Sequence, residues 1–134
     1  SVSFVPHVAI YMFSYGLLGC ATLLALYGLF RPERNLHEAI DRLLYGGVGL
    51  FTIGMLTGAL WAKQAWGDFW TWDPKETWAL ATLLIYALPL HRSSFPLFKR
   101  DVCFHTYCIL AFASVLMTYF GVNHLLGGLH SYGG

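Results

Sequence analysis

The sequence predicts an all-α membrane protein with four transmembrane helices and a tryptophan-rich outer segment between the second and the third helix. Of its 134 residues, 57% are hydrophobic and only 11% are charged, whereas soluble domains usually have about 25% charged residues. The apolar residues form four runs separated by short polar segments, and such runs suit the ~30 Å hydrocarbon core of a bilayer. We expect residues 1–134 to form a single membrane domain and to be a fragment of a larger polytopic protein.

The first two apolar runs are long enough for one spanning helix each. The first run extends from Val8 to Phe30, and Pro32 follows where that helix has stopped. The second run, from Leu43 to Ala62, is rich in glycine, and its Gly54 and Gly58 form a GxxxG pair. Because such pairs let another helix approach closely in lipid, we interpret this one as a packing feature and not as the mark of a function.

The third and fourth runs complete the bundle. The third run, from Thr77 to Leu90, is short by itself, but Asp73, Pro74 and Glu76 resemble an N-cap, N1 and N3. The third helix is therefore expected to begin at Asp73, at the membrane surface. After a polar turn, the fourth run extends from Val102 to Leu126.

The positions of lysine and arginine predict the orientation. With four helices, the first and third connections share one side, and they hold six of the eight basic residues: Arg31, Arg34, Arg42, Arg92, Lys99 and Arg100. Such an excess marks the cytoplasmic side. His7, His130 and the tryptophan-rich segment then share the outer side. The net charge of +1 argues neither for nor against nucleic acid, but the basic residues form no stripe, so we expect no nucleic-acid partner.

Two histidines flank an aromatic segment on this outer side. His7 precedes the first helix, His130 follows the fourth, and residues 66–78 contain four of the five tryptophans. Haem is a flat, mostly apolar disc whose iron takes axial imidazole nitrogens, so this combination suits it. A membrane-interface belt explains one or two tryptophans at a helix end, and that alternative stays open on the residues alone.

The segment WGDFWTWDPKETWAL closely resembles the tryptophan-rich signature of the haem-handling membrane proteins of cytochrome c maturation. This superfamily includes the CcsA/ResC, CcmC and CcmF types. The continuation DPKETW, the lead-in ALWAKQAWG and the tail GVNHLLGGLHSYG are similar to the CcsA type in particular. The likeness extends from His7 to Gly134 and implies the carboxyl-terminal membrane core of a larger CcsA-like protein.

This resemblance implies a set of site residues. The implied cofactor is haem b (iron protoporphyrin IX), with His7 and His130 as its axial ligands, and His124 is the rival of His130. His91 looks like one of the family's internal histidines, whose partner lies in a region that this chain does not contain. The residues implied to shape the outer site are Trp66, Gly67, Asp68, Phe69, Trp70, Trp72, Asp73 and Trp78.

Two further histidines and the cysteines receive structural interpretations. His105 lies about one turn into the fourth helix, where we favour a hydrogen bond to a neighbouring helix over iron ligation. His37 lies in a charged connection and is expected to be solvated. The three cysteines sit inside apolar runs without a CxxC pair, which is typical of small buried hydrophobic residues.

The function that the resemblance implies is haem handling in cytochrome c biogenesis, as part of a holocytochrome c synthase (haem lyase). The chain would present haem to the CxxCH segment of an apocytochrome c, together with a CcsB/ResB-type membrane partner or fused domain. It would lie in the bacterial inner membrane or the plastid thylakoid, with the tryptophan-rich segment on the periplasmic or lumenal side. The alternatives are a CcmC-like haem chaperone or exporter, a non-catalytic membrane subunit, and a cytochrome b-like carrier, which histidines near helix ends disfavour.

Overall fold

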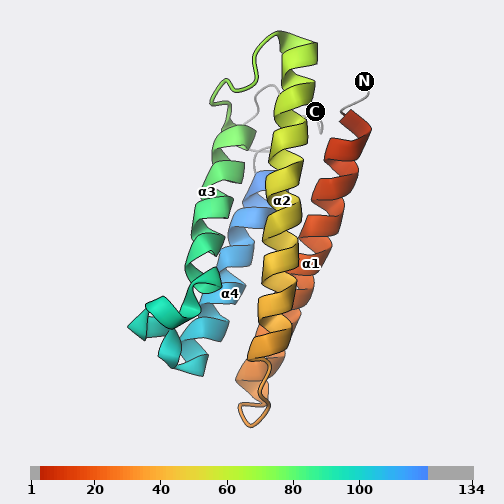
Figure 1. The fold of residues 1–134 in the computed structure, drawn as a ribbon. Helices are drawn as coiled ribbons and strands as arrows, with labels where there is room; N and C mark the ends of the chain where they lie inside the picture. Colours follow the sequence, from red (N-terminus) through yellow and green to blue (C-terminus); the bar gives the residue numbers. More distant parts are fainter. Residues whose placement is uncertain (1–3, 121–134) are drawn as a thin grey trace.

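The computed structural model describes residues 4–120, and this part of the chain is helical and contains no strand (Figure 1). Its α-helices run alternately up and down, so that helices adjacent in sequence are antiparallel. The elements in chain order are α1 (Phe4–Phe30), α2 (His37–Trp66), α3 (Pro74–Leu90), η1 (Arg92–Ser94), η2 (Pro96–Lys99) and α4 (Asp101–Leu116). The expected all-α class is confirmed.

Three helices in the described part are long and apolar enough to cross a membrane, namely Val5–Phe30, His37–Trp66 and Asp101–Phe120. The remaining helix, α3, has 17 residues, which gives it a length of about 25 Å. That length is at the short end of the range for spanning helices. A fourth span through α3 therefore stays a prediction.

The second helix is longer than the apolar run that predicts it. It begins at His37 rather than at Leu43, and it includes Trp66 at its other end. The additional first turns carry an ion pair four residues apart, in which Arg42 Nη2 lies 2.6 Å from Glu38 Oε1. Such pairs stabilise the exposed face of a helix, so α2 continues beyond the hydrophobic run into its polar flank. The first helix likewise starts about one turn before its run.

Close packing of α1 on α2 is the main contact of the bundle. The Ser14 hydroxyl donates a hydrogen bond of 2.7 Å to the carbonyl oxygen of Gly47. A Cβ atom added at Gly47 would lie 2.7 Å from the Leu18 side chain, so a larger residue there would have to displace Leu18. Small residues that let two backbones approach are the usual packing device between membrane helices.

The cysteines are only partly as expected. Cys108 is buried in the core, whereas Cys103 is half-buried and Cys20 is exposed. Cys20 is exposed because the face of α1 that carries it is not covered by any of the described helices. The interpretation as a buried hydrophobic residue is therefore right for Cys108 and wrong for Cys20.

The two ends of the bundle differ in composition. The start of α1, the end of α2 and the start of α3 meet at one end, which we call the tryptophan end (Figure 1). The connections 31–36 and 91–100 meet at the other, which we call the basic end. The expected grouping of His7 with the tryptophan-rich segment is thus observed. The side of a membrane that each end faces stays a prediction.

Candidate functional site

Two adjoining pockets lie at the tryptophan end, and His7, Tyr11 and Lys75 line both of them. The first pocket, of about 30 Å³, is bounded by α1, α2, α3 and the loop between α2 and α3. The second, of about 180 Å³, lies between α1, α3 and Tyr119, which follows α4. The remaining residues lining the first pocket are Met55, Gly58, Ala59, Phe69, Trp70, Glu76 and Ala79.

His7 is held by α2 in one orientation. Its side chain is only 6% exposed, and its Nδ1 donates a hydrogen bond of 2.8 Å to the carbonyl oxygen of Gly54. A proton on Nδ1 leaves the lone pair on Nε2. Histidines that bind metals are commonly fixed by a hydrogen bond of this kind from the other ring nitrogen. The ring is therefore in the tautomer that a metal ligand through Nε2 requires.

The glycine pair on α2 makes room for the two rings that α1 contributes. A Cβ atom added at Gly58 would lie 2.6 Å from His7 Cε1, and one added at Gly54 would lie 2.5 Å from Tyr11 Cδ1. Helices α1 and α2 do pack closely here, as the GxxxG pair predicts. The sequence interpretation missed that the pair also positions His7. The matching spacing of four residues, in His7 and Tyr11 on α1 and in the two glycines on α2, could have indicated it.

Trp61 is an aromatic residue of the site that the sequence interpretation missed. Its ring stacks on the His7 imidazole, with 6.4 Å between ring centroids and 12° between planes. Trp66 in turn meets Trp61 edge-on, at 4.6 Å between centroids. Trp66 belongs to the last turn of α2 and not to the loop, so it acts on the site through Trp61.

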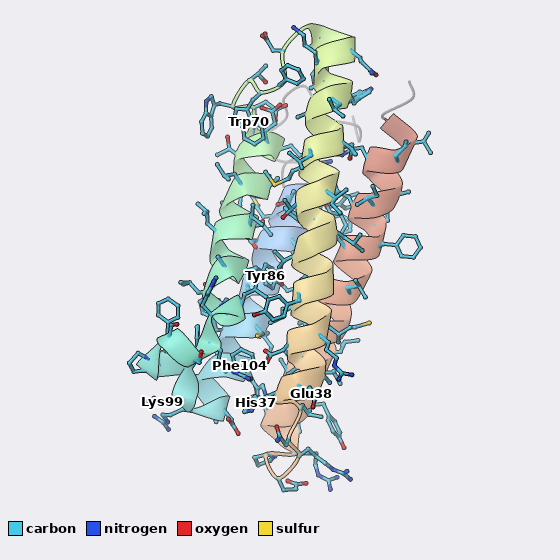
Figure 2. The ribbon with its side chains drawn as sticks, viewed as in Figure 1. His37, Glu38, Trp70, Tyr86, Lys99 and Phe104 are labelled. Atoms are coloured by element: carbon cyan, nitrogen blue, oxygen red, sulfur yellow. The ribbon has the colours of Figure 1, made fainter. Side chains whose placement is uncertain are left out.

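Of the other predicted site residues in and around the loop after α2, some line the first pocket and others do not. Gly67 ends the helix with a φ of 89°, a left-handed conformation that glycine adopts without strain. Phe69 and Trp70 line the first pocket, and Figure 2 shows Trp70 at the tryptophan end. Trp72 has a φ of 57° and is 65% exposed. Gly67, Asp68 and Trp72 thus lie on the exposed surface, while the half-buried Trp78 belongs to α3.

A capping box fixes the start of α3, as the sequence predicts. The Asp73 carboxylate accepts hydrogen bonds from the backbone N–H of Lys75, at 2.8 Å, and of Glu76, at 3.1 Å. The Glu76 carboxylate accepts from the backbone N–H of Asp73 and of Thr71. These bonds tie the loop to the first turn of α3, and they hold Phe69 and Trp70 near the pocket.

Replacing Asp73 with alanine is therefore expected to destabilise the protein by about 1 kcal/mol, because the two amides lose their acceptor. Asp73→Asn is the matched control, since asparagine caps a helix almost as well. Unfolding of the detergent-solubilised protein by sodium dodecyl sulfate, followed by circular dichroism, measures both. Equal stability of the alanine and asparagine variants would contradict the capping role.

The basic end carries the remaining described histidines. His91 is exposed, and its Nδ1 donates to the carbonyl oxygen of Ala87 at 2.8 Å. His37 is not simply solvated, because it is half-buried and its Nε2 lies 2.9 Å from Asp101 Oδ1. His105 is buried, and its Nε2 has no hydrogen-bond partner among residues 4–120. The expected bond from His105 to a neighbouring helix is therefore not seen for this atom.

The structure brings together only part of the predicted set. His7, Phe69 and Trp70 share one pocket, and His91 lies at the opposite end of the bundle. His124 and His130 lie outside the described residues. The described arrangement combines a fixed imidazole, aromatic walls and a buried amine. These groups suit a flat, apolar metal complex that carries anionic substituents.

Comparisons with known proteins agree with the tryptophan-rich signature. The model of the family described as "Cytochrome C assembly protein" matches residues 1–130. The chain is 47% identical to the cytochrome c biogenesis protein CcsA of Gloeobacter violaceus over 114 residues, which cover 81% of this chain and 33% of that protein. It is 48% identical to CcsA of Pyropia yezoensis over 105 residues, which cover 74% of this chain and 32% of that protein.

A longer relative also matches. The chain is 37% identical to the protein NrfI of Wolinella succinogenes over 139 aligned positions, which cover 94% of this chain and 15% of that protein. The chain thus spans about a third of the length of the CcsA relatives and a smaller share of NrfI.

Proposed function

Because the chain belongs to the cytochrome c assembly protein family, we propose that it binds haem b at the tryptophan end and presents it for thioether attachment to the CxxCH segment of apocytochrome c. The observation that supports this most directly is His7. It is buried in an aromatic pocket, and its Nδ1 is bonded to Gly54 O, which orients Nε2 as a ligand. Iron porphyrins in proteins are bound in this way by neutral imidazole.

Each described residue then has a distinct part in binding haem. His7 supplies one axial nitrogen, Phe69 and Trp70 form an apolar wall, and Asp73 keeps the start of α3 in place. Trp66 supports the site through Trp61. Haem is a large apolar disc, so contact with aromatic side chains favours its binding.

The remaining predicted residues are part of the proposal on weaker support. His130 is the proposed second axial ligand, with His124 as its rival. Gly67, Asp68 and Trp72 shape the exposed rim next to the pocket, and Trp78 belongs to the same motif on α3. His91, at the basic end, is the proposed internal residue.

Attachment needs little acid–base chemistry from the protein. Each cysteine S–H of the apocytochrome adds across one haem vinyl group, so that the sulfur bonds to carbon and the hydrogen completes the second vinyl carbon. The role of this chain is to hold haem in an orientation in which its vinyl groups can meet the two cysteines. Positioning of this kind contributes to catalysis without acid–base groups. The histidine of CxxCH would replace one of the chain's iron ligands and so release the product.

The surroundings follow from the same proposal. The tryptophan end faces the periplasmic or lumenal side, the basic end faces the cytoplasm or stroma, and α3 crosses the membrane as the fourth span. The membrane is the bacterial inner membrane or the plastid thylakoid. A CcsB/ResB-type partner or fused domain completes the synthase.

The test is co-expression of the full-length protein and its partner with a CxxCH apocytochrome in cells that lack their own maturation proteins. We expect covalent haem on the apocytochrome, measured by haem staining after denaturing electrophoresis, and haem absorption bands in the purified membrane protein. Haem bands without covalent product would favour the chaperone or exporter alternative. A folded full-length protein without haem bands would overturn the proposal and leave the tryptophans as a membrane-interface belt.

A further inference from the structure

The last turn of α3 is interrupted by a proline, and side chains from two other helices bond to its backbone. Pro89 has no backbone N–H, so the carbonyl oxygen of Ile85, four residues earlier, lacks its usual helical donor. The Tyr107 hydroxyl of α4 donates to this oxygen at 2.7 Å. The Tyr45 hydroxyl of α2 donates at 3.0 Å to the carbonyl oxygen of Leu90, the last residue of α3. Two tyrosines thus tie this helix end to α2 and α4.

The residues on both sides of His91 are held by the same face of α2. Leu90 precedes His91 and accepts the hydrogen bond from Tyr45. Arg92 follows His91, and its Nη2 lies 2.9 Å from Asp41 Oδ2. Because Asp41 and Tyr45 are four residues apart on α2, they are neighbours on one face of that helix. The chain before and after His91 is therefore fixed to a single helix face.

The His91 ring is itself fixed by the helix turn that it ends. Its Nδ1 donates to the carbonyl oxygen of Ala87 at 2.8 Å, and its backbone N–H donates to that of Leu88 at 3.1 Å. A proton on Nδ1 places the lone pair on Nε2, and a hydrogen bond of this kind is common in histidines that bind metals. His91 is exposed, so it presents a ligand nitrogen at the surface of the basic end.

Satisfying the backbone of α3 does not account for both tyrosines. A carbonyl group that a helix proline leaves without its donor needs another one where water is excluded, and the half-buried Tyr107 meets that need. Tyr45, in contrast, is 60% exposed, so solvent could donate to the Leu90 oxygen in its place. A hydrogen bond that solvent could replace contributes mainly position, and the residue next to Leu90 is His91.

We propose that Tyr45 and Tyr107 are positioning residues for His91, and that they hold its Nε2 where it binds haem iron at the basic end. The inference rests on the proposed function, in which His91 is the internal residue, and it names the groups that orient this residue. A ligand that its surroundings already hold in place loses less conformational freedom on binding, which raises affinity. Loss of either hydroxyl should therefore weaken haem binding only through His91.

The experiment is a double-mutant cycle on the full-length protein in detergent micelles. Haem is titrated into apoprotein and followed by the Soret band, and the His91-dependent haem is the part that His91→Ala fails to bind. Tyr45→Phe and Tyr107→Phe each remove one hydroxyl and keep the ring, and both are made in the wild type and in the His91→Ala background. Tyr27→Phe is the matched control, since Tyr27 is an exposed tyrosine near the end of α1.

We expect the double variant Tyr45→Phe/Tyr107→Phe to bind the His91-dependent haem about tenfold more weakly, the lower end of the cost of losing the groups that support a metal ligand. Each single variant should lie between the double variant and the wild type, and Tyr27→Phe should match the wild type. In the His91→Ala background the tyrosine substitutions should change haem binding no further, because they act through His91. Circular dichroism reports that each variant is folded.

Two results would overturn the inference alone. They are tyrosine variants that bind haem as the wild type does, and equal losses of haem binding in both backgrounds. The second would mean that the tyrosines only stabilise the bundle. If His91→Ala itself binds haem as the wild type does, the proposed internal role of His91 fails, and the inference fails with it. Haem binding at the tryptophan end is tested separately with His7→Ala, so the two failures can be told apart.

Discussion

Replacing His7 with alanine is expected to lower the affinity of the full-length protein for haem by more than about tenfold. Loss of a single residue that merely supports a metal ligand costs 10–100-fold, and here the ligand itself is removed. The variant should also lose the α and β bands of the dithionite-reduced, six-coordinate form. Absorption spectroscopy of the purified protein, with pyridine haemochrome quantification, measures both effects.

Chemical rescue separates a ligand role from a packing role. Imidazole added at millimolar concentration fits the space that the alanine leaves beside Gly58, and it should restore the reduced spectrum. A packing defect would not respond to it. His37→Ala is the matched control, because His37 is a histidine at the basic end and its loss should leave the bands unchanged. If the bands persist in His7→Ala, the iron ligand among residues 4–120 is not His7, and His91 and His105 are the next candidates.

The helical architecture could be predicted because hydrophobic runs and capping signals are local. The capping box at Asp73 and Glu76 is present as the sequence predicts. Helix ends are less well predicted, since α2 continues to His37 through polar residues that an apolar run cannot indicate. Cys20 is exposed for a similar reason: an apolar run shows that a residue avoids water but not whether another helix covers it.

The site was predictable only as a gathering of residue types at one end. Aromatic residues and His7 are recognisable in the sequence, and they do meet. The contacts that orient them depend on which faces of α1 and α2 touch, and this is a property of the packed bundle. For that reason the hydrogen bond to Gly54 and the stacking of Trp61 were missed. The burial of Lys75 is likewise a property of the packed bundle.

Gly58→Ala is expected to disturb the proposed iron ligand His7 directly. The new methyl group would lie 2.6 Å from His7 Cε1 and 2.7 Å from His7 Nδ1. The His7 ring cannot move away from this methyl group without stretching its hydrogen bond to Gly54 O, because Gly54 and Gly58 both belong to α2. We therefore expect a loss of about 1–3 kcal/mol in unfolding free energy, the usual cost of overpacking, and about tenfold weaker haem binding.

Two other glycines of α2 provide matched controls. A Cβ at Gly49 meets no atom within 4 Å, so Gly49→Ala should retain haem binding. Its stability should be unchanged or higher by up to about 1 kcal/mol, the gain in helix propensity from glycine to alanine. Gly47→Ala presses on Leu18, away from the pocket. It should therefore cost stability while the folded protein keeps its haem affinity.

A double-mutant cycle then identifies the imidazole as the group through which Gly58 acts. In the His7→Ala background no ring stands against the added methyl group, so Gly58→Ala should cost little further haem affinity or stability. Strong non-additivity of this kind is expected for residues in direct contact. If the two substitutions were instead additive, Gly58 would affect haem through the general approach of α1 and α2. The four-residue spacing that Gly54 and Gly58 share with His7 and Tyr11 would then have no part in orienting the His7 ring.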